Sequence, residues 1–147
     1  MIALIQRVKS AKVVAQGKEV SSIDKGFLVF LGVEKGDDET DVEYISKKIV
    51  NLRIFEDEKG KMSKSIKEIG GSILLVSEFT LVGNLKKGYR PDFSLAENKE
   101  KAKKIYEEVA KMIEKEDIIV KLGIFGAYME VFLINDGPVT IILNSKK

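Results

Sequence analysis

The stretch Gly26-Phe27-Leu28-Val29-Phe30-Leu31-Gly32-Val33 is a continuous apolar run with a glycine near each end. Such a run is typical of a strand that is covered on both faces, so it predicts a buried central strand. Before it, residues 2 to 8 alternate in the manner of a strand, and residues Ala11 to Gln16 indicate a second one, followed by a turn at Gly17-Lys18. The chain is therefore expected to begin with strands that flank a central one.

Hydrophobic periodicity predicts two helices. The first has candidate caps at Asp37, Asp38 and Thr40, and its apolar face comprises Val42, Ile45, Ile49 and Leu52. The second is expected to begin at a capping box in Ser94-Leu95-Ala96-Glu97 and to run to about Lys115. Its apolar face comprises Ala102, Ile105, Tyr106, Val109, Met112 and Ile113.

The remaining apolar segments predict more strands. One is expected from Ser72 to Leu81, and its polar second half carries Ser77, Glu78 and Thr80. The sheet is completed by Ile118 to Leu122, Met129 to Ile134 and Val139 to Leu143. The predicted order is ββ-(βα)2-βββ. This order indicates a single α+β domain over residues 1–147, with layers in the order β/β/α and the helices on one side.

The composition excludes several kinds of chemistry. The chain has no His and no Cys, so a Ser-His-Asp triad, thiol catalysis and structural Cys/His zinc sites are ruled out. No apolar run is as long as a membrane span, and no basic leader precedes a cleavage site, so we expect a cytoplasmic protein without disulfides. The net charge of +2 does not indicate a nucleic-acid binder, although a local basic patch would suffice.

The segment Ile134-Asn135-Asp136-Gly137-Pro138-Val139-Thr140 joins the last two apolar runs. Asp-Gly between such runs signals a hairpin, but the proline removes an N–H where the next strand should begin. One interpretation is a surface turn. The other is a rigid projection that presents backbone acceptors to a binding site, with a cis bond between Gly137 and Pro138, which proline permits at low cost.

Three other positions also allow two interpretations. Arg7 lies among apolar neighbours, where a solvent-facing charge is the simpler expectation and a forked donor to backbone carbonyls is the alternative. The basic loop from Val82 to Phe93 suits a phosphate backbone, although a plain surface loop has a similar composition. The turn Glu56-Asp57-Glu58 offers carboxylates without metal-loop spacing, so we expect no metal and no cofactor.

Three stretches together resemble the D-aminoacyl-tRNA deacylase (D-tyrosyl-tRNA deacylase) family: Ser77-Glu78-Phe79-Thr80-Leu81, Gly123-Ile124-Phe125-Gly126-Ala127-Tyr128-Met129 and Asn135-Asp136-Gly137-Pro138-Val139-Thr140. The opening Ile5-Gln6-Arg7-Val8 and the loop Arg90-Pro91-Asp92-Phe93 also fit, and the match spans the chain in the right order. The resemblance implies an enzyme that hydrolyses the ester joining a D-amino acid to the 3′ end of tRNA and that removes mischarged glycine. It also implies a homodimer.

The resemblance further implies roles for individual residues. Gly137 and Pro138 of one subunit would enter the site of the other and direct their carbonyls toward the α-carbon of the substrate. An L side chain would then clash with them, and Arg7 would steady those carbonyls. Backbone N–H groups near Phe79 and Thr80 would stabilise the developing oxyanion.

Ser77, Phe79 and Thr80 are the predicted catalytic residues. Because no His is present to activate Thr80, we do not expect Thr80 to attack the ester. The resemblance implies instead that water attacks with help from the ribose 2′-hydroxyl, while Thr80 positions the substrate. Glu78, a predicted substrate-binding residue, replaces the usual Gln of the family, and an ionised Glu cannot donate a hydrogen bond. The other predicted substrate-binding residues, interpreted either as core or as a wall for the terminal adenine, are Phe125 and Met129.

Two other classes of function stay open from the sequence. A non-catalytic RNA-binding or assembly module would explain the basic loop and the missing His, but it gives no reason for the Gly-Pro projection. A metal-dependent hydrolase would use the carboxylates of Glu56, Asp57 and Glu58. Such a hydrolase would lose its activity when a chelator is added, whereas the deacylase would not.

Overall fold

Strand β1 (Ile2–Ala15) changes its partner halfway along its length. In the computed structural model, which describes residues 1–147, its first half pairs with β3 (Gly26–Gly32) and its second half with β2 (Lys18–Ile23). The strands predicted at residues 2–8 and 11–16 are therefore one strand. They stay continuous because a single neighbouring strand pairs with both halves. The sequence pattern did not predict β2.

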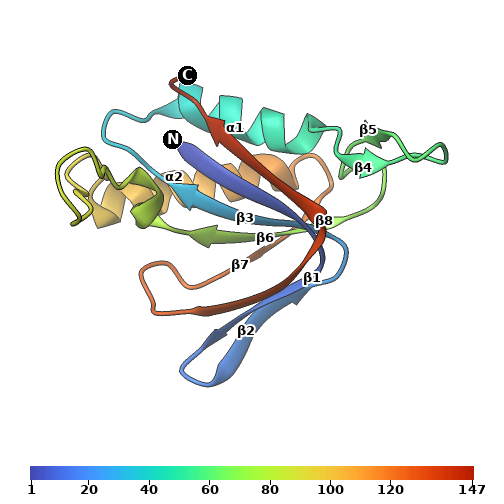
Figure 1. Ribbon diagram of the computed structural model, residues 1–147, viewed down its shortest axis with the longest axis horizontal. Coiled ribbons are helices and arrows are strands. Elements are labelled where there is room, and N and C mark those ends of the chain that lie inside the picture. Colours follow the sequence, from blue (N-terminus) through green and yellow to red (C-terminus); the bar gives the residue numbers. More distant parts are fainter.

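The predicted central strand is confirmed as β3, in the middle of a sheet with the order β2-β1-β3-β6-β7 (Figure 1). β3 runs antiparallel to β1 and parallel to β6 (Ser72–Ser77), which is parallel to β7 (Ile119–Leu122). The last strand, β8 (Glu130–Asn144), pairs antiparallel with β1 from one end to the other. β1 and β8 together curl away from the rest of the sheet.

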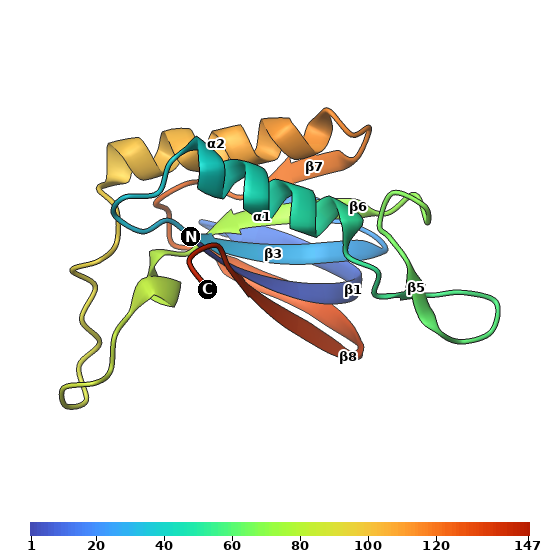
Figure 2. The same ribbon diagram turned by 90° about the horizontal axis from the view of Figure 1, so that it is seen from above.

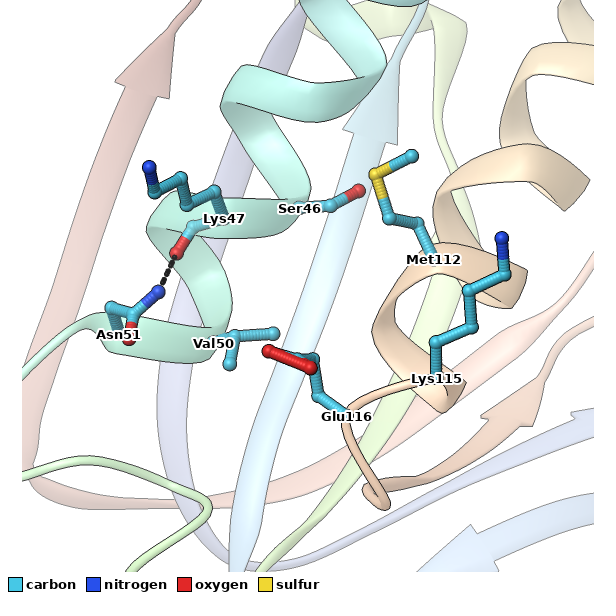
Figure 3. Close-up of a pocket in the computed structure, with 7 residues that line it drawn as sticks. All are labelled: Ser46, Lys47, Val50, Asn51, Met112, Lys115 and Glu116. Atoms are coloured by element: carbon cyan, nitrogen blue, oxygen red, sulfur yellow. Dashed lines mark hydrogen bonds between the residues drawn. The ribbon is translucent and has the colours of Figure 1, made fainter.

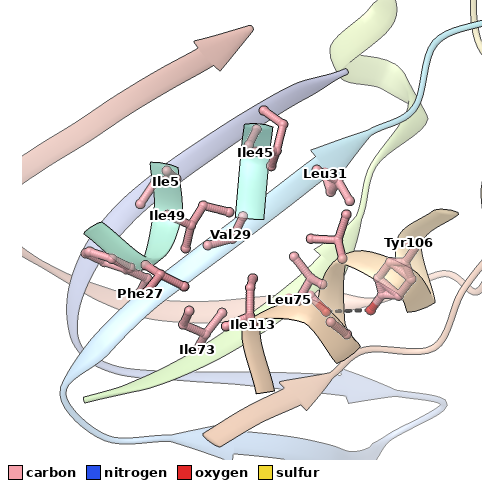
Figure 4. Close-up of a cluster of buried hydrophobic side chains, with 14 of the residues drawn as sticks. Ile5, Phe27, Val29, Leu31, Ile45, Ile49, Ile73, Leu75, Tyr106 and Ile113 are labelled. Atoms are coloured by element: carbon pink, nitrogen blue, oxygen red, sulfur yellow. Dashed lines mark hydrogen bonds between the residues drawn. The ribbon is translucent and has the colours of Figure 1, made fainter. Parts of the chain in front are cut away.

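Helices α1 (Glu39–Asn51) and α2 (Lys99–Glu114) lie next to each other on one face of the sheet (Figures 1 and 2). The main core fills the space beneath them and includes the fully buried residues Phe27, Ile49, Leu75 and Ile113 (Figure 4). On the opposite face the curled sheet packs on itself around Val8, Ala11, Val13, Ile23, Leu28, Leu74 and Val76. These two cores produce the predicted β/β/α layers, and the α+β class is confirmed. Neither helix combines the length and apolarity needed to cross a membrane.

The start of α1 follows the predicted capping chemistry. Asp38 is the N-cap, and its Oδ1 accepts a hydrogen bond from the Thr40 N–H at 2.9 Å. The side chain of Asp41 accepts a hydrogen bond from the Asp38 N–H at 2.9 Å, which completes a reciprocal pair. Two backbone donors that the first turn leaves unpaired are thereby satisfied.

The start of α2 differs from the prediction. Its N-cap is Asn98, whose Oδ1 accepts a hydrogen bond from the Lys101 N–H at 2.9 Å. The capping box predicted at residues 94–97 is therefore wrong. That segment instead forms a turn, in which the Ala96 N–H donates to the Phe93 carbonyl at 3.0 Å. The turn is held against the residues that follow β3, where the Glu97 N–H donates to the Val33 carbonyl at 3.0 Å. Tertiary pairing has overridden a local helix signal.

The strand predicted from Ser72 to Leu81 ends early, at Ser77. The Glu78 N–H still donates to the Leu31 carbonyl at 2.8 Å, but the Leu81 N–H then turns back to the Glu78 carbonyl at 3.3 Å. The chain consequently forms a short 3-10 helix, η1 (Phe79–Val82), in place of the second half of the strand. This turn brings polar residues to the edge of the sheet.

A small hairpin of β4 (Phe55–Glu56) and β5 (Met62–Lys64) lies outside the main sheet and was not predicted. The carboxylate of Asp57 holds its turn by accepting hydrogen bonds from the Ser63 hydroxyl at 2.7 Å and from the Lys59 and Lys61 N–H groups at 2.8 and 3.0 Å. These hydrogen bonds, that of Ser63 above all, hold the pKa of Asp57 below its usual value. The carboxylate considered for a metal site is thus part of a turn.

The last two predicted strands are the two halves of β8. Gln6 of β1 pairs with Thr140 and Val8 pairs with Asn135, so Arg7 alone faces residues 136–139 of β8. The extra residues form a bulge, which we call the β8 bend (Asp136–Val139). Both halves continue in one direction along β1, and the predicted three final strands are therefore two. A proline is tolerated in the bulge because no ladder hydrogen bond needs its missing N–H.

Polar residues tie the end of the chain to the first turn of α1. The Ser145 hydroxyl donates to Asp41 Oδ1 at 2.6 Å, and Lys146 Nζ donates to Asp41 Oδ2 at 3.0 Å. Burial by itself would raise the pKa of Asp41. The hydrogen bonds from Ser145, the Asp38 backbone and Lys146 together outweigh burial and lower that pKa to about 2.

We predict that Asp41 makes the folded state less stable in acid. Because its pKa is about 2 in the folded protein against an ordinary 3.8, its contribution is complete above about pH 4 and is lost as the pH falls through about 2. The contribution is roughly 2 kcal/mol. Urea denaturation from pH 2 to 7 should show that Asp41→Asn is less stable by that amount at pH 7 and declines less in acid.

The control is Asp24→Asn, which changes an exposed carboxylate that has no ion pair. This variant should follow the wild-type profile within about 0.5 kcal/mol. A profile for Asp41→Asn that is parallel to the wild type at every pH would contradict the assignment.

Candidate functional site

A groove of about 420 Å³ lies between the end of β6 and the loop that precedes β8. Residues Ser77 to Thr80 contribute to it from the turn after β6, and residues Gly126 to Met129 contribute from the loop. The remaining lining residues are Phe30, Val76 and Val131. The groove therefore brings together two of the three sequence motifs, although about fifty residues separate them along the chain.

The turn after β6 leaves two backbone donors free beside this groove. The N–H of Glu78 is bonded to the Leu31 carbonyl, and the N–H of Leu81 is bonded to the Glu78 carbonyl. The N–H groups of Phe79 and Thr80, which lie between them, begin a 3-10 turn and have no hydrogen-bond partner in the chain. Two adjacent free N–H groups at a groove can bind a negatively charged oxygen.

The side chains of this turn are available to a ligand. Thr80 is exposed, Ser77 and Glu78 are half-buried, and none of the three side chains is hydrogen-bonded to another residue. The Phe79 ring is 57% exposed and meets the Phe93 ring edge-on, with 5.1 Å between the ring centroids. Since no hydrogen bond joins Glu78 to Thr80 and the chain has no His, no positioned base activates the Thr80 hydroxyl.

Met129 lines the groove and also shapes the loop that precedes it. Its Sδ accepts a hydrogen bond from the Ile124 N–H at 3.4 Å and lies 2.8 Å from the position that a β-carbon would occupy on Gly123. Gly126 has a φ of +78°, and Lys99 Cε lies 2.7 Å from the position of its absent β-carbon. A side chain at Gly126 would therefore be strained by the backbone conformation and would push the flexible end of Lys99 aside.

Phe125 lies outside the groove, so of its two interpretations the structure shows core packing. Its ring packs against the ring of Tyr106, with 5.7 Å between the centroids. The Tyr106 hydroxyl donates to the Leu75 carbonyl at 2.6 Å, and the Gly123 N–H donates to the same carbonyl at 3.1 Å (Figure 4). Burial raises the pKa of Tyr106, which keeps it a neutral donor. The sequence pattern identified Tyr106 only as a core residue, yet it ties α2 and β6 to the groove loop.

The third motif lies elsewhere in the protomer. The Gly137–Pro138 peptide bond is cis, and both residues are exposed. No residue of the β8 bend lines the groove. Both Figure 1 and Figure 2 show the middle of β8 and the η1 turn on opposite sides of the molecule. One protomer therefore does not bring its own Gly137–Pro138 segment to its own groove.

Arg7 lies beneath the β8 bend and is buried, because the alternation along β1 places it on the same face as Ile5. Its Nε donates to the Asp136 carbonyl at 2.9 Å, and its Nη1 donates to the Ile54 carbonyl at 2.6 Å. The expectation of a solvent-facing charge is wrong, and the forked donor is the arrangement found. The carbonyl that it holds is the one immediately before Gly137–Pro138, not a carbonyl of that pair.

Asn135 holds the β8 bend from within, and the sequence motif gave no separate role to this residue. Its Oδ1 accepts a hydrogen bond from the Val139 N–H at 2.8 Å, and its Nδ2 donates to Thr140 Oγ1 at 3.1 Å. A β-carbon on Gly137 would lie 2.8 Å from Val139 Cγ2 and 3.2 Å from Arg7 Nη2. The bend is thus fixed on both sides, and its tip faces outward.

A second cavity, of about 310 Å³, lies between the C-terminal ends of α1 and α2 (Figure 3). Its lining residues are Ser46, Lys47, Val50, Asn51, Met112, Lys115 and Glu116. The hydrogen bond drawn there, from Asn51 Nδ2 to the Lys47 carbonyl at 2.8 Å, stays within one helix. None of the predicted site residues lies in this cavity, so the groove beside η1 is the candidate site.

A family model described as D-Tyr-tRNA(Tyr) deacylase matches residues 4–144 of the chain. The D-aminoacyl-tRNA deacylase of Aquifex aeolicus is 53% identical over 147 residues, which cover 100% of this chain and 99% of that protein. The D-aminoacyl-tRNA deacylase of Thermodesulfovibrio yellowstonii is 52% identical over 146 residues, which cover 99% of this chain and 100% of that protein.

Solved structures show the same fold. A structure described as c-Myc DNA Unwinding Element Binding Protein has a TM-score of 0.92 and 43% identity, and the match covers 98% of both chains. A second structure, of a probable eukaryotic D-amino acid tRNA deacylase, has a TM-score of 0.81 and covers 97% of both chains. Its identity is 16%, so it shows a likeness of fold alone.

We predict that Arg7 is a main determinant of the stability of the β8 bend. Arg7→Met keeps much of the side-chain volume but leaves the carbonyls of Asp136 and Ile54 without their donor. Losing hydrogen bonds from a buried charged group costs about 2–4 kcal/mol. Guanidinium denaturation should show a fall of this size in the free energy of unfolding.

Arg53→Met is the matched control. Arg53 Nε also donates to a backbone carbonyl, that of Ser63 at 2.7 Å, but on the exposed surface. Water replaces the lost donor there, so we expect a change within about 0.5 kcal/mol. Equal losses in the two variants would show that the buried position of Arg7 has no special importance.

Proposed function

The chain belongs to the D-Tyr-tRNA(Tyr) deacylase family, and from this membership we propose how its groove separates D-aminoacyl-tRNA from the L form. The enzyme is a hydrolase of the ester that joins a D-amino acid to tRNA. One observation carries the proposal. Residues Ser77 to Thr80 and Met129 line one groove, while the exposed β8 bend lies away from it. We infer that a second copy of the chain supplies the bend.

The free edge of β8 supports a homodimer. β8 pairs with β1 alone, so its other edge has unpaired backbone groups. Along it, Phe132, Ile134 and Ile142 are 47%, 57% and 70% exposed. An apolar, unpaired edge strand is a typical surface for association with another chain. In the proposed dimer each copy inserts its bend into the groove of the other.

The inserted bend would select the substrate by exclusion. Main-chain atoms of Gly137 and Pro138 would lie against the α-carbon and occupy the space that an L side chain needs. A D side chain points away from them, and glycine has no side chain to reject, so mischarged glycyl-tRNA would also be a substrate. The hydrogen bonds that Arg7 and Asn135 make to the bend support this role. A mobile bend would move aside and let the L side chain bind.

The free N–H groups of Phe79 and Thr80 support a mechanism of hydrolysis by water. Water attacks the ester carbonyl, the two N–H groups stabilise the oxyanion, and the bond to the ribose oxygen then breaks. The ribose 2′-hydroxyl assists the transfer of the proton of water to that leaving oxygen. Thr80 and Ser77 position the ester. Glu78, which accepts but does not donate when ionised, suits the ammonium group of the substrate.

We also propose a single domain, a cytoplasmic location and a contact of the groove with the terminal adenine. Two cores that share β1, β3 and β6 favour one deacylase domain over residues 1–147. A cytoplasmic location follows from the tRNA substrate. Met129 lines the groove and is favoured as a contact for the terminal adenine, whereas Phe125 would act from behind the loop. A carboxylate-metal hydrolase has less support, because Asp57 and Glu58 are engaged in the β4–β5 hairpin.

We predict that the wild-type protein releases tyrosine from D-Tyr-tRNA and not from L-Tyr-tRNA, and that Gly137→Ala weakens this selection. A β-carbon at Gly137 must displace Val139 or Arg7, so the bend shifts. The ratio of the two kcat/KM values should fall about tenfold or more, which corresponds to about 1.4 kcal/mol of lost discrimination. The measurement is release of radiolabelled tyrosine from each charged tRNA.

Gly17→Ala provides the control for this variant. Gly17 also has a positive φ, of +74°, but nothing lies within 4 Å of its absent β-carbon, and it is in the turn between β1 and β2. It should keep the wild-type ratio. Equal release from both enantiomers by the wild type would reject selection by handedness, and release from neither would favour a non-catalytic RNA-binding or assembly module.

We predict that Thr80 positions the ester and does not attack it. Thr80→Ala should keep measurable turnover of D-Tyr-tRNA, with kcat lowered by about 10- to 100-fold, because the backbone N–H of residue 80 remains. Thr80→Ser, which keeps the hydroxyl, should stay within a few-fold of the wild type. A covalent acyl-enzyme trapped in the wild type, and absent from an inactive Thr80→Ala variant, would identify Thr80 as the nucleophile.

A further inference from the structure

Residues 84–92 form an arm that extends from the body of the protein (Figure 2). Its base is closed by two backbone hydrogen bonds between Asn84 and Asp92, each 2.9 Å long. Every residue from 85 to 92 is exposed, and the Tyr89 side chain is fully so, at 102%. A closed base with exposed side chains makes the arm a defined structure without a core of its own.

The arm has a net positive charge, with three basic residues and one acidic residue. It carries Lys86, Lys87 and Arg90, and none of them is in an ion pair, unlike Lys101, which pairs with Glu97. The one acidic residue, Asp92, is also exposed and lies at the base of the arm. Its two carboxylate oxygens accept hydrogen bonds from the N–H and hydroxyl of a single serine, which lower its pKa. We call residues 84–92 the basic arm.

Aromatic packing joins the basic arm to the groove. Phe93, which follows the arm, packs its ring against Phe79, and Phe79 lines the groove. Phe93 Cε1 also lies 2.9 Å from the position of a β-carbon on Gly83, so Gly83 must be glycine for the ring to fit. The arm therefore starts at one rim of the groove in a fixed position.

A cation also lies at the loop side of the groove. Lys99 Nζ is 3.0 Å from the position of the absent β-carbon of Gly126, which lines the groove. Lys99 is in no ion pair of the chain. Lys99 therefore adds a positive charge beside the loop that lines the groove.

We propose that the basic arm and Lys99 bind the sugar-phosphate backbone of the RNA strand that leads into the groove. Unpaired cations bind phosphates strongly, and the exposed Tyr89 ring offers a surface on which an unstacked base can pack. This inference rests on the proposed function, since the amino acid in the groove is esterified to RNA. Such an arm would strengthen the binding of a whole tRNA, which carries phosphates. It would not affect a short ester that has the same reacting end but no phosphates.

The test compares two substrates that share the reacting ester. D-Tyr-tRNA carries phosphates, whereas D-tyrosine esterified to adenosine has none. The variant Lys86→Gln/Lys87→Gln/Arg90→Gln should raise KM for D-Tyr-tRNA about 100-fold at low salt and leave kcat unchanged. Its kcat/KM for D-tyrosyl-adenosine should stay within twofold of the wild type. A fall of equal size for both substrates would overturn the proposal, as would an unchanged KM for the tRNA.

Salt dependence provides a second measurement. Each phosphate that a cation neutralises adds about 0.7 to 0.9 to the slope of log kcat/KM against log salt concentration. The triple variant should therefore reduce this slope by about 2. The control is Lys103→Gln/Lys104→Gln/Lys111→Gln, which removes as much charge from the exposed face of α2 and should keep the wild-type slope and KM.

Binding of uncharged tRNA separates this inference from the proposed function. Fluorescence anisotropy of labelled tRNA should show binding by the wild type that weakens about 100-fold in the triple variant and about tenfold in Tyr89→Ala. If the wild type hydrolyses neither ester but binds tRNA through the arm, the proposed mechanism is wrong and the arm assignment is right. If tRNA binds the wild type and the triple variant equally, the arm assignment is wrong even when hydrolysis is observed.

Discussion

The contact on which the rest of the site depends is the pair of hydrogen bonds from Arg7 to the carbonyls of Ile54 and Asp136. A buried guanidinium is stable only when acceptors surround it, and a planar fork can hold two carbonyls that a lysine could not reach together. One side chain of β1 thereby joins the segment before β4 to the β8 bend. The bulge that exposes Gly137 and Pro138 lies opposite this single residue.

Much of the architecture follows from hydrophobic patterning. The run at Gly26–Gly32 and the periodic face of α1 predicted the central layers because local sequence and burial agree there. The errors occur where distant parts of the chain decide the outcome. Residues 94–97 carry a helix signal but pair with Val33, and the strand expected to reach Leu81 turns after Ser77 because β3 ends beside it. The local sequence pattern does not show which distant segments will pair with these residues after folding.

In the candidate site, too, some residues were predicted from the sequence and others were not. Ser77 to Thr80 and Met129 were predicted from motifs, and the fold brings them to one groove. Tyr106 was not predicted to support the groove, because its hydroxyl bonds to the Leu75 carbonyl, which is 31 residues away in the sequence. Asn135 was part of a motif but had no predicted role, because the motif does not show which side chain holds the bend. Arg7 was predicted through its motif, although its apolar neighbours concealed its buried position. The sequence did offer a signal of burial, because Arg7 lies two residues after Ile5 and alternate residues of a strand share one face.

The outward-facing tip of the β8 bend consists of main chain and one pyrrolidine ring, which has consequences for how the protein evolves. Peptide groups are the same whichever side chains surround them. Neighbouring residues can therefore be substituted without altering the backbone atoms at the tip. Only the few residues that hold the loop in shape are constrained. Relatives that share about half their residues with this chain can therefore present the same backbone atoms at this position while their exteriors diverge.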